Sequence, residues 1–508
     1  MSLKRQVASG MFWVALAQMS GQGLTMLVGL ILPKLLSPAQ MGLAGMAMLA
    51  ISALELFQDA GLESALIYRR KEVKEASDTV FIVVIASSLV IFLVAYIAAP
   101  LIGRFFREPA VVPILRVLAL TLPISSLGRV PYVLLGRELD FRRRIFPELI
   151  SSLIASAVVV VLAFRGFGVW SLVWREIIRQ VLATLLVWPM TSYRPRLRFN
   201  MAIARELFDY GKHIVSSQTL IFLITNIDNA LVGRYAGMTA LGQYQWAYNL
   251  SNRPATTINR TVTQVMFPTF SKLTEGNREK MAEVRARYYL TLVRYITWIM
   301  APITIATILF ARNFILDIYG PTWAPAIVPL QILAVYGFIR AIAANMGSVY
   351  RAMGKPQWLT SIALWRLITM AVALYVILVP LGLGITAVSW LSAVVAVIDF
   401  VIGAVLVNRL MAAPASAYLR RIVPALTTAL MAGVIAHWCY PRLPLPRPSL
   451  RLLAAGALLV LLYAILTWLI DASFRSTLRM GYGALRRTLA QRRGGPPTSE
   501  ASPGSDDR

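Results

Sequence analysis

Apolar stretches near 20 residues in length recur from one end of this chain to the other. Each stretch is long enough to cross a bilayer as a helix. The chain therefore has the pattern of an all-α polytopic membrane protein with about fourteen transmembrane helices. The expected spans are residues 11–32, 41–66, 79–102, 111–136, 146–164, 168–190, 209–235, 242–268, 288–311, 326–350, 359–380, 384–406, 422–440 and 452–471.

The basic residues of the chain indicate its orientation. Lys and Arg number 50 and the formal net charge is +27, although 58% of the residues are hydrophobic and the mean hydropathy is +0.66. Lipid expels charge, so most of these residues must lie outside the hydrocarbon. They gather in alternate connections, such as the one with Arg142, Arg143 and Arg144, and in both terminal segments. Because cytoplasmic loops are rich in Lys and Arg, we expect a cytoplasmic (inner) membrane protein with both termini in the cytoplasm.

Several functions are disfavoured by what the sequence lacks. A single cysteine, Cys439, excludes an intramolecular disulfide framework, and two histidines argue against a metal cluster. There is no P-loop, so nothing indicates ATP hydrolysis. No soluble basic domain is present for nucleic acid, and no long aqueous loop carries acid–base residues. We therefore expect no cofactor, no metal, no nucleic-acid partner and no catalysis.

The spans divide into two halves around a basic connection at 191–208, which follows six spans. In this connection Asn200 is placed to cap a short interfacial helix. Similar short stretches around Gly42 and Gly242 follow the first span of each half. The predicted organisation is an N-terminal six-helix lobe at 1–190, a cytoplasmic linker at 191–208, a C-terminal six-helix lobe at 209–410, two additional helices at 411–471 and a basic tail with a disordered end at 472–508.

A polar stripe in the eighth span is the clearest candidate site. Its members recur at helical spacing and are Asn249, Arg253, Thr256, Arg260 and Gln264, widened by Asn252. Such a stripe must face the bundle interior or a water-filled cavity. Arginine suits phosphate because its planar fork presents several donors. The alternative is that these arginines pair with acidic residues or carbonyls and hold helices together.

Further charged residues lie within other spans. The arginine candidates for the same central cavity are Arg340, Arg175, Arg179, Arg129 and Arg116. Asp228 is the most notable carboxylate, because a buried carboxylate could bind a coupling proton or Na⁺. We favour the alternative that Asp228 pairs with a neighbouring arginine.

An ordered series of motifs resembles a known group of transporters. The series includes LLSPAQMGLAGMAM (35–48), FQDAGLESALIYRR (57–70), LLGRELDFRR (134–143), GFGVWSLV (166–173), RPRLRF (194–199), NIDNALVGRYAG (226–237), ALGQYQWAYNL (240–250), YGPTWAPA (319–326) and AMGKP (352–356). In these stretches the chain resembles the polysaccharide repeat-unit flippases (Wzx type) of the multidrug/oligosaccharidyl-lipid/polysaccharide exporter superfamily. The likeness is greatest to the lipopolysaccharide and colanic-acid exporter branch.

The resemblance implies a fold and a function. The implied fold has two six-helix lobes around a V-shaped central cavity, with two additional helices. The implied function is alternating access that carries an undecaprenyl-diphosphate-linked oligosaccharide from the inner to the outer leaflet. The implied partners are this anionic lipid-linked oligosaccharide and membrane lipids, with a polysaccharide polymerase and a chain-length regulator as further candidates.

Three alternatives stay open on the sequence. A multidrug or toxin antiporter is disfavoured, because an arginine-rich cavity would repel cationic drugs. An envelope enzyme such as a polymerase or ligase is disfavoured by the short outer loops. A flippase for a lipid-linked peptidoglycan precursor is the nearest competitor, and the sequence separates it poorly from the leading interpretation.

Overall fold

The computed structural model describes residues 21–479 apart from 22, 59–60, 63–65, 68, 70–71, 139, 273–277, 412 and 478. Within these residues all regular structure is helical. The first expected span is described only as a helix over 23–35, and most of the expected basic tail lies outside the described residues.

The first half of the described chain forms one group of helices. Together with the helix over 23–35, this N-terminal group contains α2 (Pro38–Gln58), α4 (Val73–Phe106), α5 (Val111–Leu118), α6 (Thr121–Arg137), α7 (Phe141–Phe164) and α8 (Val169–Val187), followed by the 3-10 turn η1 (Trp188–Met190).

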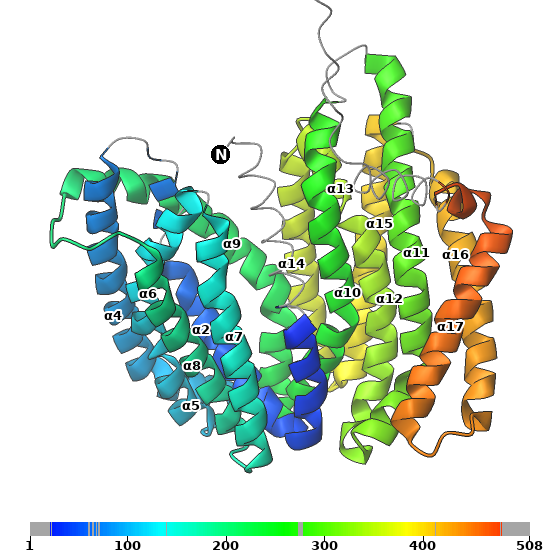
Figure 1. Ribbon diagram of the computed structural model, residues 1–508, viewed down its shortest axis with the longest axis horizontal. Helices are drawn as coiled ribbons and strands as arrows, with labels where there is room; N and C mark the ends of the chain where they lie inside the picture. Colours follow the sequence, from blue (N-terminus) through cyan, green and yellow to red (C-terminus); the bar gives the residue numbers. More distant parts are fainter. Residues whose placement is uncertain are drawn as a thin grey trace, which may run out of the picture.

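The second half forms a C-terminal group. Its helices are α9 (Met201–Tyr235), α10 (Gly237–Lys272), α11 (Arg278–Ile318), α12 (Ile327–Ala343), α13 (Met346–Ala352), α14 (Gln357–Leu378), α15 (Ile385–Met411), α16 (Ala415–Cys439) and α17 (Pro448–Ile470), with the 3-10 turns η2 (Pro321–Ala326) and η3 (Tyr440–Arg442). Figure 1 shows the two groups side by side, with α16 and α17 at the far edge of the second.

The hydrophobic helices confirm a multi-pass membrane protein. Among the described residues, ten helical segments are long and apolar enough to cross a membrane. Helices α8, α9 and α10 lie at expected spans but are not among these ten. They carry more polar side chains, including Arg175, Glu176 and Arg179 on α8. The total of fourteen spans therefore stays a prediction.

The two groups touch where α2 meets α10. A Cβ atom added to Gly42 would lie 1.9 Å from the carbonyl oxygen of Met238. Reciprocally, a Cβ atom added to Gly242 would lie 1.9 Å from the carbonyl oxygen of Pro38. Only glycine permits backbones to approach this closely. The two glycines around which the sequence repeats itself therefore form a close contact between the groups.

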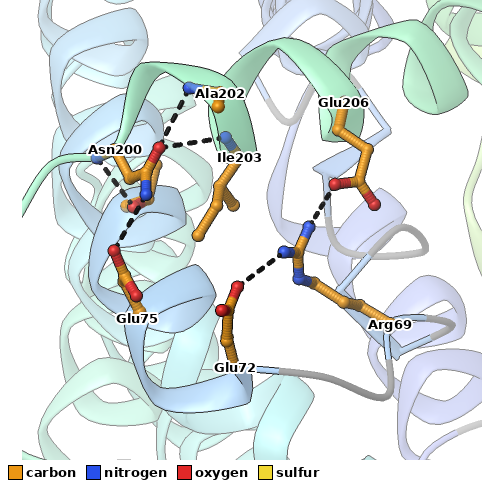
Figure 2. Close-up of polar contacts among 8 residues, drawn as sticks. Arg69, Glu72, Glu75, Asn200, Ala202, Ile203 and Glu206 are labelled. Atoms are coloured by element: carbon orange, nitrogen blue, oxygen red, sulfur yellow. Dashed lines mark hydrogen bonds and ion pairs between the residues drawn. The ribbon is translucent and has the colours of Figure 1, made fainter.

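The connection between the groups is fixed to α4 by hydrogen bonds. The Asn200 side chain accepts hydrogen bonds from the backbone N–H groups of Ala202 (3.0 Å) and Ile203 (3.3 Å) and donates one to Glu75 (2.9 Å), as Figure 2 shows. Beside it, Arg69 bridges Glu72 and Glu206. Asn200 is thus the expected helix cap, and it also ties the start of α9 to the N-terminal group.

A second set of contacts holds the connection further upstream. The carboxylate of Asp78 accepts hydrogen bonds from the Tyr193 hydroxyl (2.9 Å) and from the backbone N–H of Arg196 (3.1 Å). Burial and this carboxylate raise the pKa of Tyr193, so its hydroxyl stays a donor across the physiological range. The basic linker is therefore held by its backbone and by Tyr193.

The helix that begins at Asn200 is not the short interfacial helix expected from the sequence. It continues without a break as α9, which runs from Met201 to Tyr235. No proline interrupts these residues, so the helix has no reason to end near residue 208. Helix α9 packs on α2 and α4 in one group and on α10 and α14 in the other, and so links both (Figure 1).

Candidate functional site

Two predicted site arginines, Arg253 and Arg175, come from different groups of helices, and the charge of Arg175 acts on Arg253. Arg253 on α10 extends toward the helix over 23–35, where its Nη1 donates a hydrogen bond to the carbonyl oxygen of Thr25 (3.0 Å). A Cβ atom at Gly29 would lie 3.0 Å from the same Nη1, so glycine leaves room for the guanidinium. Arg175 on α8 is half-buried, and it forms no hydrogen bond or ion pair within the described residues. Within the described part of the chain neither cation forms an ion pair with a carboxylate, although the charge of Glu176 acts on Arg175.

The other members of the polar stripe are only partly described by the structure. Asn249 is exposed, whereas Asn252 is buried and its Oδ1 has no hydrogen-bond partner among the described residues. Thr256 donates a hydrogen bond to the backbone carbonyl of Arg253 (2.9 Å). Arg260 and Gln264 belong to α10, but their side chains lie outside the described part. The structure thus shows only the first half of the predicted stripe.

Arg129 and Arg179 lie in a polar cavity of about 250 Å³ within the N-terminal group. Side chains from α2, α6, α7 and α8 line this N-terminal pocket, among them Glu55 and Glu148. Arg179 donates from Nε to Glu176 (3.0 Å) and from Nη2 to Gln180 (3.0 Å). These two predicted site residues are therefore brought together, and they share their pocket with carboxylates.

Arg340 and Asp228 line a cavity of about 330 Å³ within the C-terminal group. In this C-terminal pocket, Arg340 donates from Nη1 to the hydroxyls of Tyr248 (2.9 Å) and Tyr336 (3.3 Å). Asp228 is 5% exposed and accepts hydrogen bonds from the Tyr244 hydroxyl and from the Asn229 backbone N–H, both at 2.8 Å. The pocket therefore has a hydrogen-bonded network at one side.

The favoured interpretation of Asp228 needs correction. We expected an ion pair with a neighbouring arginine, but within the described residues no arginine lies within ion-pair distance of its carboxylate. Its direct partner is the Tyr244 hydroxyl, while the charge of Arg340 acts on it from further away. The physical reason is geometric, because Tyr248 and Tyr336 hold the Arg340 guanidinium.

Arg116 is separate from the other candidates. Its Nε donates to the carbonyl oxygen of Tyr96 on α4 (3.3 Å), and its guanidinium lies 4.6 Å from the centre of the Tyr96 ring. It lines neither of the two pockets. A backbone carbonyl and an aromatic ring thus account for this charge.

Sequence reasoning missed several residues of these pockets. Glu148 lies near the start of its expected span and Tyr132 near the end of another, where polar groups attract no notice. In the structure the Tyr132 hydroxyl lies 3.4 Å from Glu148 Oε2. Tyr248 lies one residue before Asn249 in the stripe, which is the one signal that could have drawn attention to it.

Comparison with known proteins shows the family of this chain. Residues 31–328 match the model of the family described as "Polysaccharide biosynthesis protein", which is more than half of the chain. The chain belongs to this family. This confirms the resemblance drawn from the motifs.

Individual relatives agree with the family. The chain is 26% identical over 442 residues to "Teichuronic acid biosynthesis protein TuaB" of Bacillus subtilis (strain 168), covering 86% of this chain and 89% of the relative. It is also 26% identical over 333 residues to "Succinoglycan biosynthesis transport protein ExoT" of Rhizobium meliloti (strain 1021), covering 65% and 66% of the two chains.

A solved structure supports the fold. "Lipid II flippase MurJ, inward closed conformation" superposes with a TM-score of 0.71 at 13% identity, covering 91% of this chain and 99% of the other. At this identity the likeness concerns the fold alone.

Proposed function

We propose that this protein is a flippase that carries a lipid-linked oligosaccharide repeat unit across the cytoplasmic membrane during polysaccharide biosynthesis. The observation that carries the proposal is the family membership together with two arginines, Arg175 and Arg253, that come from different groups of helices and form no ion pair in the described chain. The names of the relatives concern polysaccharide biosynthesis and transport. The substrate is an undecaprenyl-diphosphate-linked unit for exopolysaccharide, O-antigen or capsule.

The chemistry of the two arginines suits the diphosphate. A guanidinium binds phosphate oxygens through two parallel hydrogen bonds, and such charge-assisted bonds are the strong ones. Coulomb attraction is also larger in a poorly hydrated space than in bulk water. Arg175 and Arg253 repel one another until an anion lies between them, so a diphosphate would draw the two groups of helices toward itself.

Transport then follows from movement of one group against the other. Six helices in each of two lobes, 1–190 and 209–410, border a central V-shaped cavity, with the linker at 191–208 and two further helices at 411–471. Both termini lie in the cytoplasm. The close contact at Gly42 and Gly242 closes one end of the cavity, and separating α2 from α10 opens it. Alternating access releases a substrate that the arginines would otherwise hold too tightly.

Asp228 is the candidate for coupling transport to an ion. Its carboxyl lines the C-terminal pocket and is almost fully buried. A proton or Na⁺ bound there would change the charge balance with Arg340, and hence the packing of α9 against α10. The antiporter alternative is less favourable, since the two unpaired arginines would repel cationic drugs.

The proposal is tested in a strain that lacks the gene and carries plasmid-borne variants. Arg175→Gln and Arg253→Gln should each lower polymer output by about tenfold, because each removes a charged hydrogen bond of about 1.5–3 kcal/mol. Complete lipid-linked units should accumulate on the cytoplasmic leaflet. Arg116→Gln is the matched control and should keep normal output. Wild-type output from well-expressed Arg175→Gln and Arg253→Gln variants would contradict the assignment.

A further inference from the structure

The N-terminal pocket has a composition that neither phosphate recognition nor helix packing requires. Its charged lining consists of two carboxylates, Glu55 and Glu148, and two guanidiniums, Arg129 and Arg179. Ionisable side chains within membrane-spanning helices are by default candidates for a functional site. The pocket also differs from the pair Arg175 and Arg253, which forms no ion pair within the described residues.

We infer that the N-terminal pocket binds one uncharged sugar residue of the repeat unit. This inference rests on the proposed function, because it names the part of the substrate that the pocket recognises. The diphosphate would bind to Arg175 and Arg253, which come from different groups of helices. The glycan would extend into the N-terminal pocket.

The charge balance of the lining selects an uncharged ligand. The charges of Glu55 and Glu148 act on Arg179, and the charge of Arg129 acts on Glu55. An anion in the pocket would be repelled by the two carboxylates, and a cation by the two guanidiniums. A sugar hydroxyl both donates and accepts hydrogen bonds. A neutral polyol can therefore use both kinds of group at once without a net charge that either kind repels.

The lining also has hydrogen-bonding groups that the protein itself does not use. Glu55 is exposed and makes no hydrogen bond or ion pair with the described residues. Gln180 uses its Oε1 to accept from Arg179, and its Nε2 donates to no group in the described chain. Glu148 is exposed and accepts one long hydrogen bond, from Tyr132 at 3.4 Å. These groups provide both acceptors and a donor for sugar hydroxyls.

Size and shape fit a single ring. A cavity of about 250 Å³ is smaller than the usual pockets for drug-sized ligands, which begin near ~300 Å³. It therefore suits one sugar residue rather than the whole repeat unit. Tyr132 gives the wall an aromatic surface, and the guanidinium of Arg144 lies 4.4 Å from its ring centre. This contact holds the ring in place for stacking against a sugar.

The test compares two probes on the purified full chain in lipid nanodiscs. One probe is undecaprenyl diphosphate without sugar, and the other is the lipid-linked repeat unit extracted from the deletion strain. Wild-type protein should bind the repeat unit more tightly than the bare lipid. Glu55→Gln and Glu148→Gln should each lower the affinity for the repeat unit by about tenfold and leave the affinity for the bare lipid unchanged.

The controls separate this inference from the proposed function. Glu138→Gln, an exposed glutamate at the end of α6, should bind both probes normally. Arg253→Gln should lower the affinity for both probes, and that result tests the proposed function alone. Equal binding of the two probes by the wild type, or unchanged binding by both pocket variants, would overturn the sugar pocket. A rise in affinity for the repeat unit in Glu148→Gln would indicate an acidic sugar and would also overturn it.

Discussion

The two groups of helices each enclose a polar pocket, but they hold their charges in different ways. In the N-terminal pocket, Glu55 and Glu148 are exposed, and the lining mixes carboxylates with guanidiniums. In the C-terminal pocket, Asp228 is 5% exposed and hydrogen-bonded, and Arg340 is held by two tyrosine hydroxyls. The first pocket can offer its polar groups to a ligand, whereas the second has used most of its own.

The difference shows that a charge inside a membrane helix does not by itself mark a substrate site. Arg253 belongs to the stripe that the sequence favoured and Arg340 was a further candidate, but each lies well inside an expected span. The structure gives Arg340 two hydroxyl partners and gives Arg253 a single backbone carbonyl. Partners, rather than depth alone, decide which arginine is available to an anion.

We expect the largest effect from a substitution that disrupts the contact between α2 and α10. In Gly42→Ala the new Cβ would lie 1.9 Å from a backbone carbonyl, so α2 and α10 must separate. Overpacking of this kind costs about 1–3 kcal/mol, and we expect polymer output to fall by about tenfold or more. The measurement is polymer yield at equal protein abundance.

Gly45→Ala is the matched control for this contact. Its new Cβ would meet the Oε1 atom of Gln245 at 2.0 Å, and that atom is the end of a flexible side chain which can rotate away. Output should stay near normal in Gly45→Ala. Equal losses in the two variants, or normal output in Gly42→Ala, would show that the glycine contact does not govern movement of one group against the other.

We expect a smaller effect from removing one tyrosine hydroxyl from each pocket, and the two losses of unfolding free energy compare the pockets directly. Tyr244→Phe deletes the 2.8 Å hydrogen bond to the buried Asp228 and should cost about 1.5–3 kcal/mol of unfolding free energy. Tyr132→Phe deletes the 3.4 Å contact to the exposed Glu148 and should cost about 0.5 kcal/mol or less. The thermal unfolding midpoint in detergent measures both. A larger loss in Tyr132→Phe would reverse the comparison.

Much of the helical framework could be predicted from the sequence. The expected spans within the described residues fall on helices, because hydropathy and span length report the same physical limit. Two of them are divided, however: 111–136 is α5 followed by α6, and 326–350 is α12 followed by α13. Asn200 was also recognisable as a helix cap. The length of α9 was not, since the expectation of a short interfacial helix overlooked that no proline follows before Tyr235.

The partners of the charged residues could not be predicted. Arg340 bonds to Tyr248, which is 92 residues away, and Arg116 bonds to a backbone carbonyl that leaves no trace in the sequence. The contact of Arg179 with Glu176 is of a kind that a sequence can suggest, because the two residues are three apart on one helix. Contacts between helices depend on packing, and no pattern along one span reports them.

The most direct test of the central claim measures transport in vesicles. Purified protein is reconstituted with the repeat-unit lipid from the deletion strain, and a membrane-impermeant glycosidase reports how much glycan reaches the outer leaflet. We expect rapid transfer with the wild type, slow transfer with Arg253→Gln, and none in protein-free vesicles. Transfer no faster than in protein-free vesicles, with correctly folded wild-type protein, would contradict the account.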